Sequence, residues 1–384
     1  MKKIILLACL VVFTSCSNSS LKKEAFEMAD INMNSPNVSA CSVYLKNQYS
    51  DNPFEFGFYF NNDTQYKDFL EFEKTSISHS VYCFEMNTDK SNFPATDILK
   101  CYITGKIPSI TVYFNENDFP DTIELIELAK VFGSLNIPMY VNLMPFSSTN
   151  WPDIEKYKKK WEEAADAFST FSPNSTIIWS ISSSDTPLIE KAIPISSKFI
   201  YTGLMFYGDT ENGSSVFFNA LEHLYKSTEN PIIITALGIS HYSTKNHTYK
   251  QEEMIEILDE IYAGVITSYP RVLGIFYMNK DLALSSPANT ISNNYRITGD
   301  KNLTEDYDKI ISSSKLISRD YYKSPFLGML LDNEVYISTK FIDYHFESTP
   351  DMAKESFFYP GYISLNSLDY SFSIKNTCIY INEK

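Results

Sequence analysis

The chain has 384 residues, with 47 acidic against 32 basic side chains and a formal net charge of −15. A surface this acidic argues against binding nucleic acid or other polyanions through charge, and an uncharged partner such as a sugar fits it better. The 27 Tyr and 27 Phe residues, set against only 12 Gly, are typical of a folded protein with an aromatic-rich core.

The first 16 residues have the features of a bacterial export signal. Two lysines precede an apolar run over 4–13, which is too short to span a bilayer. The run is followed by Thr, Ser and Cys16, an ending that resembles a lipobox, in which cleavage leaves the cysteine as a lipidated N-terminus. We therefore expect a lipoprotein signal over 1–16, and a protein anchored by lipid to the cell membrane on its extracellular face.

Residues 17–53 are rich in Ser, Asn and charged residues and show no sustained period, which predicts a flexible tether. Beyond it, residues 54–320 alternate short apolar strands with amphipathic helices, a pattern that predicts a parallel (β/α)8 TIM barrel. The alternative is a doubly wound open sheet, whose usual G-x-G-x-x-G signature is absent from the sequence. The eight expected strands lie at 54–60, 79–84, 108–114, 137–144, 176–182, 198–207, 231–238 and 272–279.

The intervening helices carry start signals and buried stripes. Asp121, with Glu124 three residues later, predicts a capping box at the start of a helix over 121–135. Apolar residues over 152–171 recur at helical spacing and leave a run of lysines on the opposite face. The fifth helix, within 186–195, is expected to be short because two prolines interrupt it.

After about residue 320, aromatic and β-branched residues alternate with polar ones at period two, which predicts a small all-β domain over 321–384. Four cysteines remain in the expected mature chain after Cys16, and no C-x-x-C or Cys/His spacing suggests a metal site. We expect neither metal nor cofactor, and the pattern leaves open whether these thiols are free or paired. They are Cys41, Cys83, Cys101 and Cys378.

Five short motifs follow one another along the expected barrel. They read FLEFEK, VYCFEM, IPMYVNLMPFSSTNW, TIIWSISSSD and PIIITALGISHYS. In their order and spacing the chain resembles glycoside hydrolase family 26, a group of retaining β-mannanase-like enzymes. The resemblance covers most of 54–310. It implies a TIM barrel with catalytic glutamates at the ends of strands four and seven.

The chain departs from the family at both glutamates. On this alignment Phe146 occupies the acid/base position and Ala236 the nucleophile position, while Trp151 matches the family's Trp and Asn142 its Arg. A retaining glycosidase needs two carboxyl groups about 5–5.5 Å apart, and neither Phe nor Ala provides one. The resemblance therefore predicts a pseudo-glycosidase that binds carbohydrate without cleaving it by the family's mechanism.

The strand ends also carry groups suited to binding a sugar through stacking or hydrogen bonds. Most have a structural alternative: packing inside the barrel for Trp179, and a hydrophobic staple for the following helix for Trp151. For the aspartates it is helix capping or turn formation, and for the histidine a loop hydrogen bond. The candidate ligand-binding residues are Trp151, Trp179, Asp185, Tyr207, Asp209, His241 and Tyr242, with Ser180 and Ser182 beside them.

Two other functions remain open on the sequence. One is an active glycoside hydrolase with relocated carboxylates, built from Glu116 and Asp118 together with Asp185 or Asp209. The other is a solute-binding lipoprotein of a transporter, although such proteins usually have two lobes joined by a hinge rather than one closed barrel.

Overall fold

A computed structural model describes residues 38–382, except for 61–65, 88, 90–91, 212, 244–246, 283–292, 318, 332–333, 346–361, 368–370 and 376–377. The expected lipoprotein signal, Cys16 and the first part of the expected tether lie outside the described residues. The chain divides into two compact units. One comprises Asn52–Val265 with Arg271–Ile317, and the other contains Ile266–Pro270 and the described residues near the two ends of the chain.

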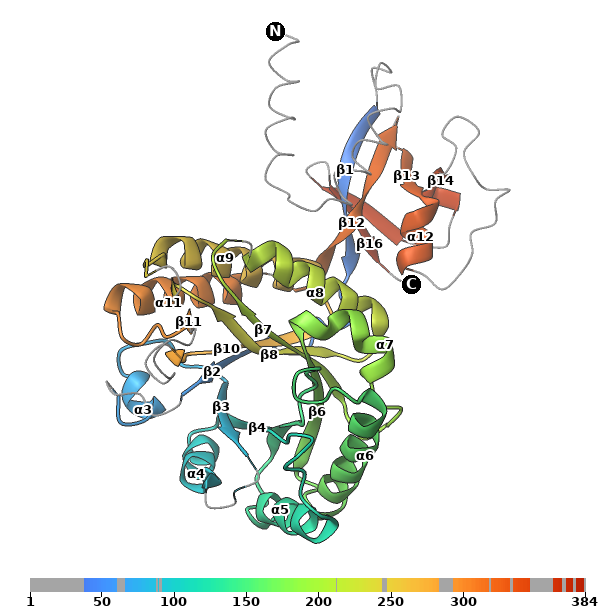
Figure 1. Cartoon of the computed structure of the whole chain (residues 1–384). Helices are drawn as coiled ribbons and strands as arrows, with labels where there is room; N and C mark the ends of the chain where they lie inside the picture. The colour runs from blue at the N-terminus through green and yellow to red at the C-terminus, as the bar shows by residue number, and fades with distance from the viewer. Residues whose placement is uncertain are drawn as a thin grey trace. The chain divides into compact units, whose positions relative to one another are not determined.

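The first unit is a closed barrel of eight parallel strands with helices around it (Figure 1). Each strand pairs with the next one along the chain, and the last pairs with the first. The predicted TIM barrel is therefore confirmed. Its strands are β2 (Glu55–Tyr59), β3 (Val81–Met86), β4 (Ile107–Val112), β5 (Met139–Leu143), β6 (Ser175–Ser182), β7 (Tyr201–Gly208), β8 (Ile232–Ile239) and β10 (Val272–Tyr277).

Helices connect the strands as the sequence predicts. Asp121 caps its helix through Ile123 N and Glu124 N, and the Glu124 side chain accepts from Asp121 N, so the capping box is confirmed. The fifth connection is short, with a 3-10 turn over Ser183–Leu188 and a single helical turn after it. The helices are α3 (Phe69–Phe72), α4 (Ala95–Ile103), α5 (Thr122–Ser134), α6 (Ile154–Phe171), α7 (Ile189–Ala192), α8 (Gly213–Ser227), α9 (Gln251–Ser268) and α11 (Lys301–Leu316).

Inward-facing side chains of alternate strand residues fill the barrel, as the period of two requires. Tyr59, Cys83, Ile233 and Phe276 belong to one buried apolar cluster in this interior. The interior is tight at Gly203 of β7, because a Cβ atom added there would lie 2.5 Å from the Ser180 Cβ.

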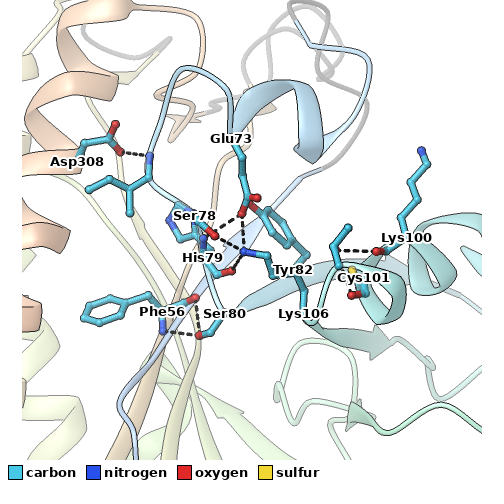
Figure 2. A network of polar contacts seen from close by, with 12 residues as sticks. Phe56, Glu73, Ser78, His79, Ser80, Tyr82, Lys100, Cys101, Lys106 and Asp308 are labelled. Carbon is cyan, nitrogen blue, oxygen red and sulfur yellow. Dashed lines mark hydrogen bonds and ion pairs between the residues drawn. The ribbon is translucent and has the colours of Figure 1, made fainter.

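A network of polar contacts lies where β3 and β4 begin, at the N-terminal end of the barrel (Figure 2). Lys106 Nζ donates to Glu73 Oε1 at 2.9 Å and to the His79 carbonyl at 2.8 Å, and Tyr82 OH donates to the same Glu73 oxygen at 2.7 Å. Burial, with the charges of Lys315 and Lys106, lowers the pKa of His79 to about 3. Because this end of a TIM barrel supports stability rather than chemistry, we interpret the network as structural.

The second unit is a six-stranded sheet in the order β14-β13-β12-β1-β16-β15. The predicted C-terminal β domain is present, but it includes a strand from before the barrel, β1 (Val38–Lys46), which runs antiparallel to β12 and parallel to β16. The expected tether over 17–53 is therefore wrong for 38–46. The remaining elements are β12 (Tyr321–Leu331), β13 (Glu334–Ser338), α12 (Thr339–His345), β14 (Tyr362–Ser364), β15 (Ser371–Lys375) and β16 (Cys378–Asn382).

The strand β1 belongs to this sheet because its alternate residues are apolar. Cys41, Val43 and Leu45 are buried in one cluster with residues of β13, α12, β14 and β16. Ser, Tyr and Lys residues occupy the alternate positions. The sheet therefore gains a central strand from a segment whose composition alone resembles a linker.

Three further observations bear on the expectations from sequence. Within the described part of the chain, no helix is both long and apolar enough to cross a bilayer. Over the same residues, His, Cys, Asp and Glu side chains form no group that could hold a metal ion. Cys41, Cys83, Cys101 and Cys378 are free thiols.

Candidate functional site

Polar and aromatic side chains meet inside the C-terminal end of the barrel, where chemistry resides in TIM-barrel enzymes. Glu85 comes from β3, Tyr113 follows β4, Tyr207 comes from β7 and Lys280 follows β10. We call these four residues the mouth cluster. Glu85 alternates with the inward-facing Cys83, so its carboxylate faces the barrel interior.

An ion pair lies at the centre of the mouth cluster. Lys280 Nζ contacts Glu85 Oε2, and Tyr113 OH donates to Glu85 Oε1 at 3.0 Å. Burial lowers the pKa of Lys280, while an adjacent carboxylate favours the charged form of a lysine. The Glu85 and Lys280 side chains are 14% and 28% exposed, which leaves both within reach of a ligand.

The phenol groups of the mouth cluster extend this arrangement. Tyr113 and Tyr207 interact through their hydroxyl groups, and burial raises the pKa of Tyr113 well above its ordinary value. Both phenols are therefore protonated at physiological pH. Tyr207 is 39% exposed, so part of its ring is accessible to a ligand.

Below the mouth, a group of uncharged polar side chains forms a network of hydrogen bonds. Ser180 Oγ donates to Asn142 Oδ1 at 2.6 Å, and the Asn142 amide lies 3.4 Å from Thr111 Oγ1. Tyr59 OH is 3.2 Å from the same Thr111 oxygen and donates to the Thr235 carbonyl at 2.8 Å. Because these groups satisfy one another, the network fixes the shape of the interior.

The two positions aligned with the family's glutamates are both fully buried. Phe146 bridges β6 through backbone hydrogen bonds to Ser180 and Ser182, and its ring packs 4.9 Å from that of Tyr157. Ala236 belongs to the interior apolar cluster. Both aligned glutamate positions are therefore occupied by buried apolar side chains.

The two candidate tryptophans do not present stacking faces, and this part of the expectation is wrong. Trp151 and Trp179 are both fully buried. The Trp151 indole donates to the Phe114 carbonyl at 3.0 Å, and the Trp179 indole donates to Tyr157 OH at 2.8 Å. Trp179 is buried in strand β6, as its structural alternative predicted, and the Trp151 ring packs 5.5 Å from that of Tyr157 in the helix that follows it.

The candidate carboxylates are held in separate local contacts. Asp185 is buried and accepts from Ser148 N and Ser148 Oγ, at 3.2 and 2.5 Å. Glu116 pairs with Lys156 at 2.7 Å. Asp209 is exposed and accepts from the backbone of the turn that it starts, at 3.0 Å, and its charge contributes to raising the pKa of the nearby Tyr295.

His241 and Tyr242 lie beside the mouth, on a two-stranded pairing of β9 (Tyr242–Ser243) with β11 (Asn293–Asn294). His241 is 4% exposed, and its Nε2 lies 2.9 Å from the Arg296 carbonyl, which is a structural contact. Tyr242 is half-buried, and its ring packs 4.6 Å from that of Tyr249. Of this pair, only Tyr242 remains accessible to a ligand.

A cavity of about 450 Å³ adjoins the mouth cluster. It is lined by Glu85, Met86, Asn87, Asn92 and Tyr113. Carboxylate, amide and phenol groups can together donate to and accept from the hydroxyl groups of a polyol. The cavity therefore suits a small polar ligand.

Sequence reasoning identified Tyr207 but missed Glu85, Tyr113 and Lys280. A signal for Glu85 was available, because a glutamate occupies the fifth position of the otherwise apolar strand VYCFEM, and a charge in a buried strand needs a partner. The partner was not predictable, since Lys280 lies 195 residues further along the chain.

No family model matches this chain, and no curated protein matches it in sequence. Solved structures similar to it include xylanase 10B from Thermotoga petrophila RKU-1 in complex with xylobiose, at 14% identity and a TM-score of 0.47, over 70% of this chain and 96% of that one. Xylanase XynB from Paenibacillus barcinonensis, complexed with a conduramine derivative, matches at 12% identity and a TM-score of 0.49, over 68% of this chain and 96% of that one. An exo-β-1,3-glucanase from Aureobasidium namibiae matches at 14% identity and a TM-score of 0.46, over 70% of this chain and 98% of that one. At these values the similarity adds no evidence on substrate or activity.

Proposed function

We propose that this protein binds carbohydrate at the mouth of its barrel and does not hydrolyse glycosides by the retaining two-carboxylate mechanism. The observation that carries the proposal is the mouth cluster, in which Glu85 and Lys280 form an ion pair flanked by the phenols of Tyr113 and Tyr207. Charged and phenolic groups beside an accessible aromatic ring bind a sugar through its hydroxyl groups and its apolar face.

The apolar side chains at the aligned catalytic positions support binding without hydrolysis. Phe146 and Ala236 are buried and cannot transfer a proton or form a glycosyl ester. Losing a member of a cooperating catalytic set costs on the order of 10⁴ to 10⁶ in rate. The alignment with glycoside hydrolase family 26 that assigns these positions is itself part of the proposal.

The sequence of the first residues supports a location at the cell surface, and the overall charge disfavours polyanionic partners. The export signal and Cys16 support a lipid anchor on the extracellular face of the cell membrane, where glycans are accessible. A net charge of −15 disfavours nucleic acid and acidic glycans as ligands. The ligand class we propose is therefore an uncharged or weakly charged oligosaccharide or cell-wall glycan.

The two other functions are less well supported. A hydrolase with relocated carboxylates would need Glu116, Asp118, Asp185 or Asp209 to face one another, whereas Glu116 is paired with Lys156 and Asp185 is buried against Ser148. A solute-binding lipoprotein would need two hinged lobes, whereas the larger unit is one closed barrel.

Isothermal titration against manno-, gluco- and peptidoglycan-derived oligosaccharides tests the proposal. We expect at least one series to bind, and we expect Glu85→Gln to weaken its binding by about tenfold or more, since hydrogen bonds to charged groups are worth about 1.5–3 kcal/mol. The matched control is Glu116→Gln, which removes a carboxylate from a similar Glu–Lys pair outside the mouth cluster and should leave the affinity unchanged.

Two results would contradict the proposal. One is the absence of binding by the wild-type protein at millimolar concentrations of every oligosaccharide. The other is an equal loss of affinity in the Glu85 and Glu116 variants, which would place the ligand elsewhere. If the wild-type protein releases reducing sugar, and Glu116→Gln or Asp209→Asn abolishes this release, the protein is the hydrolase with relocated carboxylates instead.

A further inference from the structure

We propose that the bound glycan continues from the mouth onto the exposed ring of Tyr249, so that the ligand is an oligosaccharide and a second sugar stacks outside the barrel. The inference rests on the proposed function, because it concerns the length of the ligand that the mouth binds. The feature that carries it is the pair of rings of Tyr242 and Tyr249, which we call the tyrosine ledge.

The tyrosine ledge presents a large aromatic surface to solvent. Tyr249 is 66% exposed, and its ring lies 4.6 Å from that of Tyr242, with 30° between the two planes. The ring of His241 lies 6.0 Å from Tyr249 on a nearly parallel plane. Exposed tyrosine rings offer contact area to a ligand at a low cost in conformational entropy.

Hydrogen bonds fix the position of the main chain that carries Tyr249 before any ligand arrives. Tyr249 forms a β-bridge with Tyr242, and Lys250 N donates to the His241 carbonyl at 2.8 Å. Ser240 Oγ donates to the Tyr242 carbonyl at 2.6 Å. With its main chain held and only two side-chain torsions, Tyr249 loses little freedom on binding, so more of the stacking energy contributes to affinity.

The tyrosine ledge is connected to the mouth cluster through the segment that follows β10. His241 N donates to the Asn294 carbonyl at 3.1 Å, and Tyr295 N donates to the Lys280 carbonyl at 2.8 Å. The Tyr295 ring also lies 5.9 Å from that of Tyr207. These contacts join the segments that carry the ledge and the mouth cluster, which is why we propose that one chain of linked sugars reaches both.

A single exposed aromatic residue is common on protein surfaces and needs no functional explanation. The test must therefore compare Tyr249 with a residue of similar exposure elsewhere. Tyr102 on α4 is 58% exposed and provides this control. If Tyr249 is an ordinary surface residue, the Tyr249→Ala and Tyr102→Ala variants should bind glycans alike.

The experiment measures affinities for the disaccharide and the hexasaccharide of the manno- and gluco-oligosaccharide series with three proteins: wild type, Tyr249→Ala and Tyr102→Ala. We expect the wild-type protein to bind the hexasaccharide more tightly than the disaccharide. Tyr249→Ala should weaken hexasaccharide binding by about three- to tenfold and leave disaccharide binding unchanged, while Tyr102→Ala should change neither.

The outcomes separate this inference from the proposed function. If the wild-type protein binds no oligosaccharide of the manno-, gluco- or peptidoglycan-derived series, the proposed function fails and the inference fails with it. If it binds only peptidoglycan-derived oligosaccharides, the proposed function stands and the inference for manno- and gluco-oligosaccharides is overturned. If the wild-type protein binds and Glu85→Gln weakens binding, but Tyr249→Ala leaves hexasaccharide affinity unchanged or affects both sugars equally, the proposed function stands and the inference is overturned.

Discussion

Replacing Glu55 by Gln should stabilise the barrel, and the gain should grow as the pH rises. Glu55 begins β2 at the N-terminal end of the barrel interior, and Tyr140 OH donates to its Oε1 at 2.9 Å. Burial raises the pKa of Glu55 to about 7, although the bond from Tyr140 acts in the opposite direction. The folded state therefore favours the neutral carboxyl group.

The expected magnitude follows from this shift. A rise from 4.5 to about 7, at about 1.36 kcal/mol for each unit, gives an upper limit of about 3 kcal/mol. The stabilising effect of the neutral group is complete below the unfolded pKa and is lost as the pH rises through the folded pKa of Glu55. Gln keeps the size of the side chain and can accept from Tyr140 without titrating.

Urea unfolding of both proteins between about pH 5 and pH 8 measures the effect. The difference in the free energy of unfolding, Glu55→Gln minus wild type, should increase by about 2–3 kcal/mol over this range. Glu155→Gln is the control, because the Glu155 side chain is 82% exposed, and its difference should stay constant. A difference for Glu55→Gln that is equally constant with pH would refute the assigned pKa and its cause.

Three further substitutions test the packing. Lys280→Met should cost about 3 kcal/mol in the free energy of unfolding by removing the cation that pairs with Glu85, and adding Glu85→Gln should restore most of the loss in a double-mutant cycle. Trp151→Phe should lower stability by about 1–3 kcal/mol, since it leaves the Phe114 carbonyl unsatisfied, yet leave glycan affinity unchanged; a selective loss of affinity would restore Trp151 as a ligand contact. Gly203→Ala should lower the melting temperature or prevent folding, because overpacking a tight interior costs about 1–3 kcal/mol; an unchanged melting temperature would contradict the close contact.

Local patterns in the sequence predicted most of the barrel. Each strand is a short apolar run next to a turn signal, and helices such as the one capped by Asp121 carry periodic buried stripes, so both kinds of element follow from neighbouring residues. The sheet strand β1 was missed because its pairing with β12 joins residues almost 300 positions apart, Val38 with Leu331. No local pattern specifies a partner at that separation.

The candidate site was predicted less well, because residue type was a poor guide to exposure. Trp151 and Trp179 were predicted to offer stacking faces, yet both side chains are fully buried and each indole N–H donates to a buried acceptor. Tyr207 is accessible because it lies near the end of its strand. Position along a strand therefore indicated the site better than the chemistry of the side chain.

The two carboxyl groups assigned here to the barrel interior, Glu55 and Glu85, cannot act as a catalytic pair. Gly57 is level with Val81 in the pairing of β2 with β3, so Glu55 is level with residue 79 and lies six positions below Glu85. At about 3.3 Å per residue, they are separated by roughly 20 Å, whereas glycosidase pairs lie about 5–9.5 Å apart. Their environments also differ, because burial raises the pKa of Glu55 to about 7 while Glu85 is paired with Lys280. Glu85 is therefore suited to accept hydrogen bonds from a ligand at the mouth, and Glu55 is suited only to a structural role.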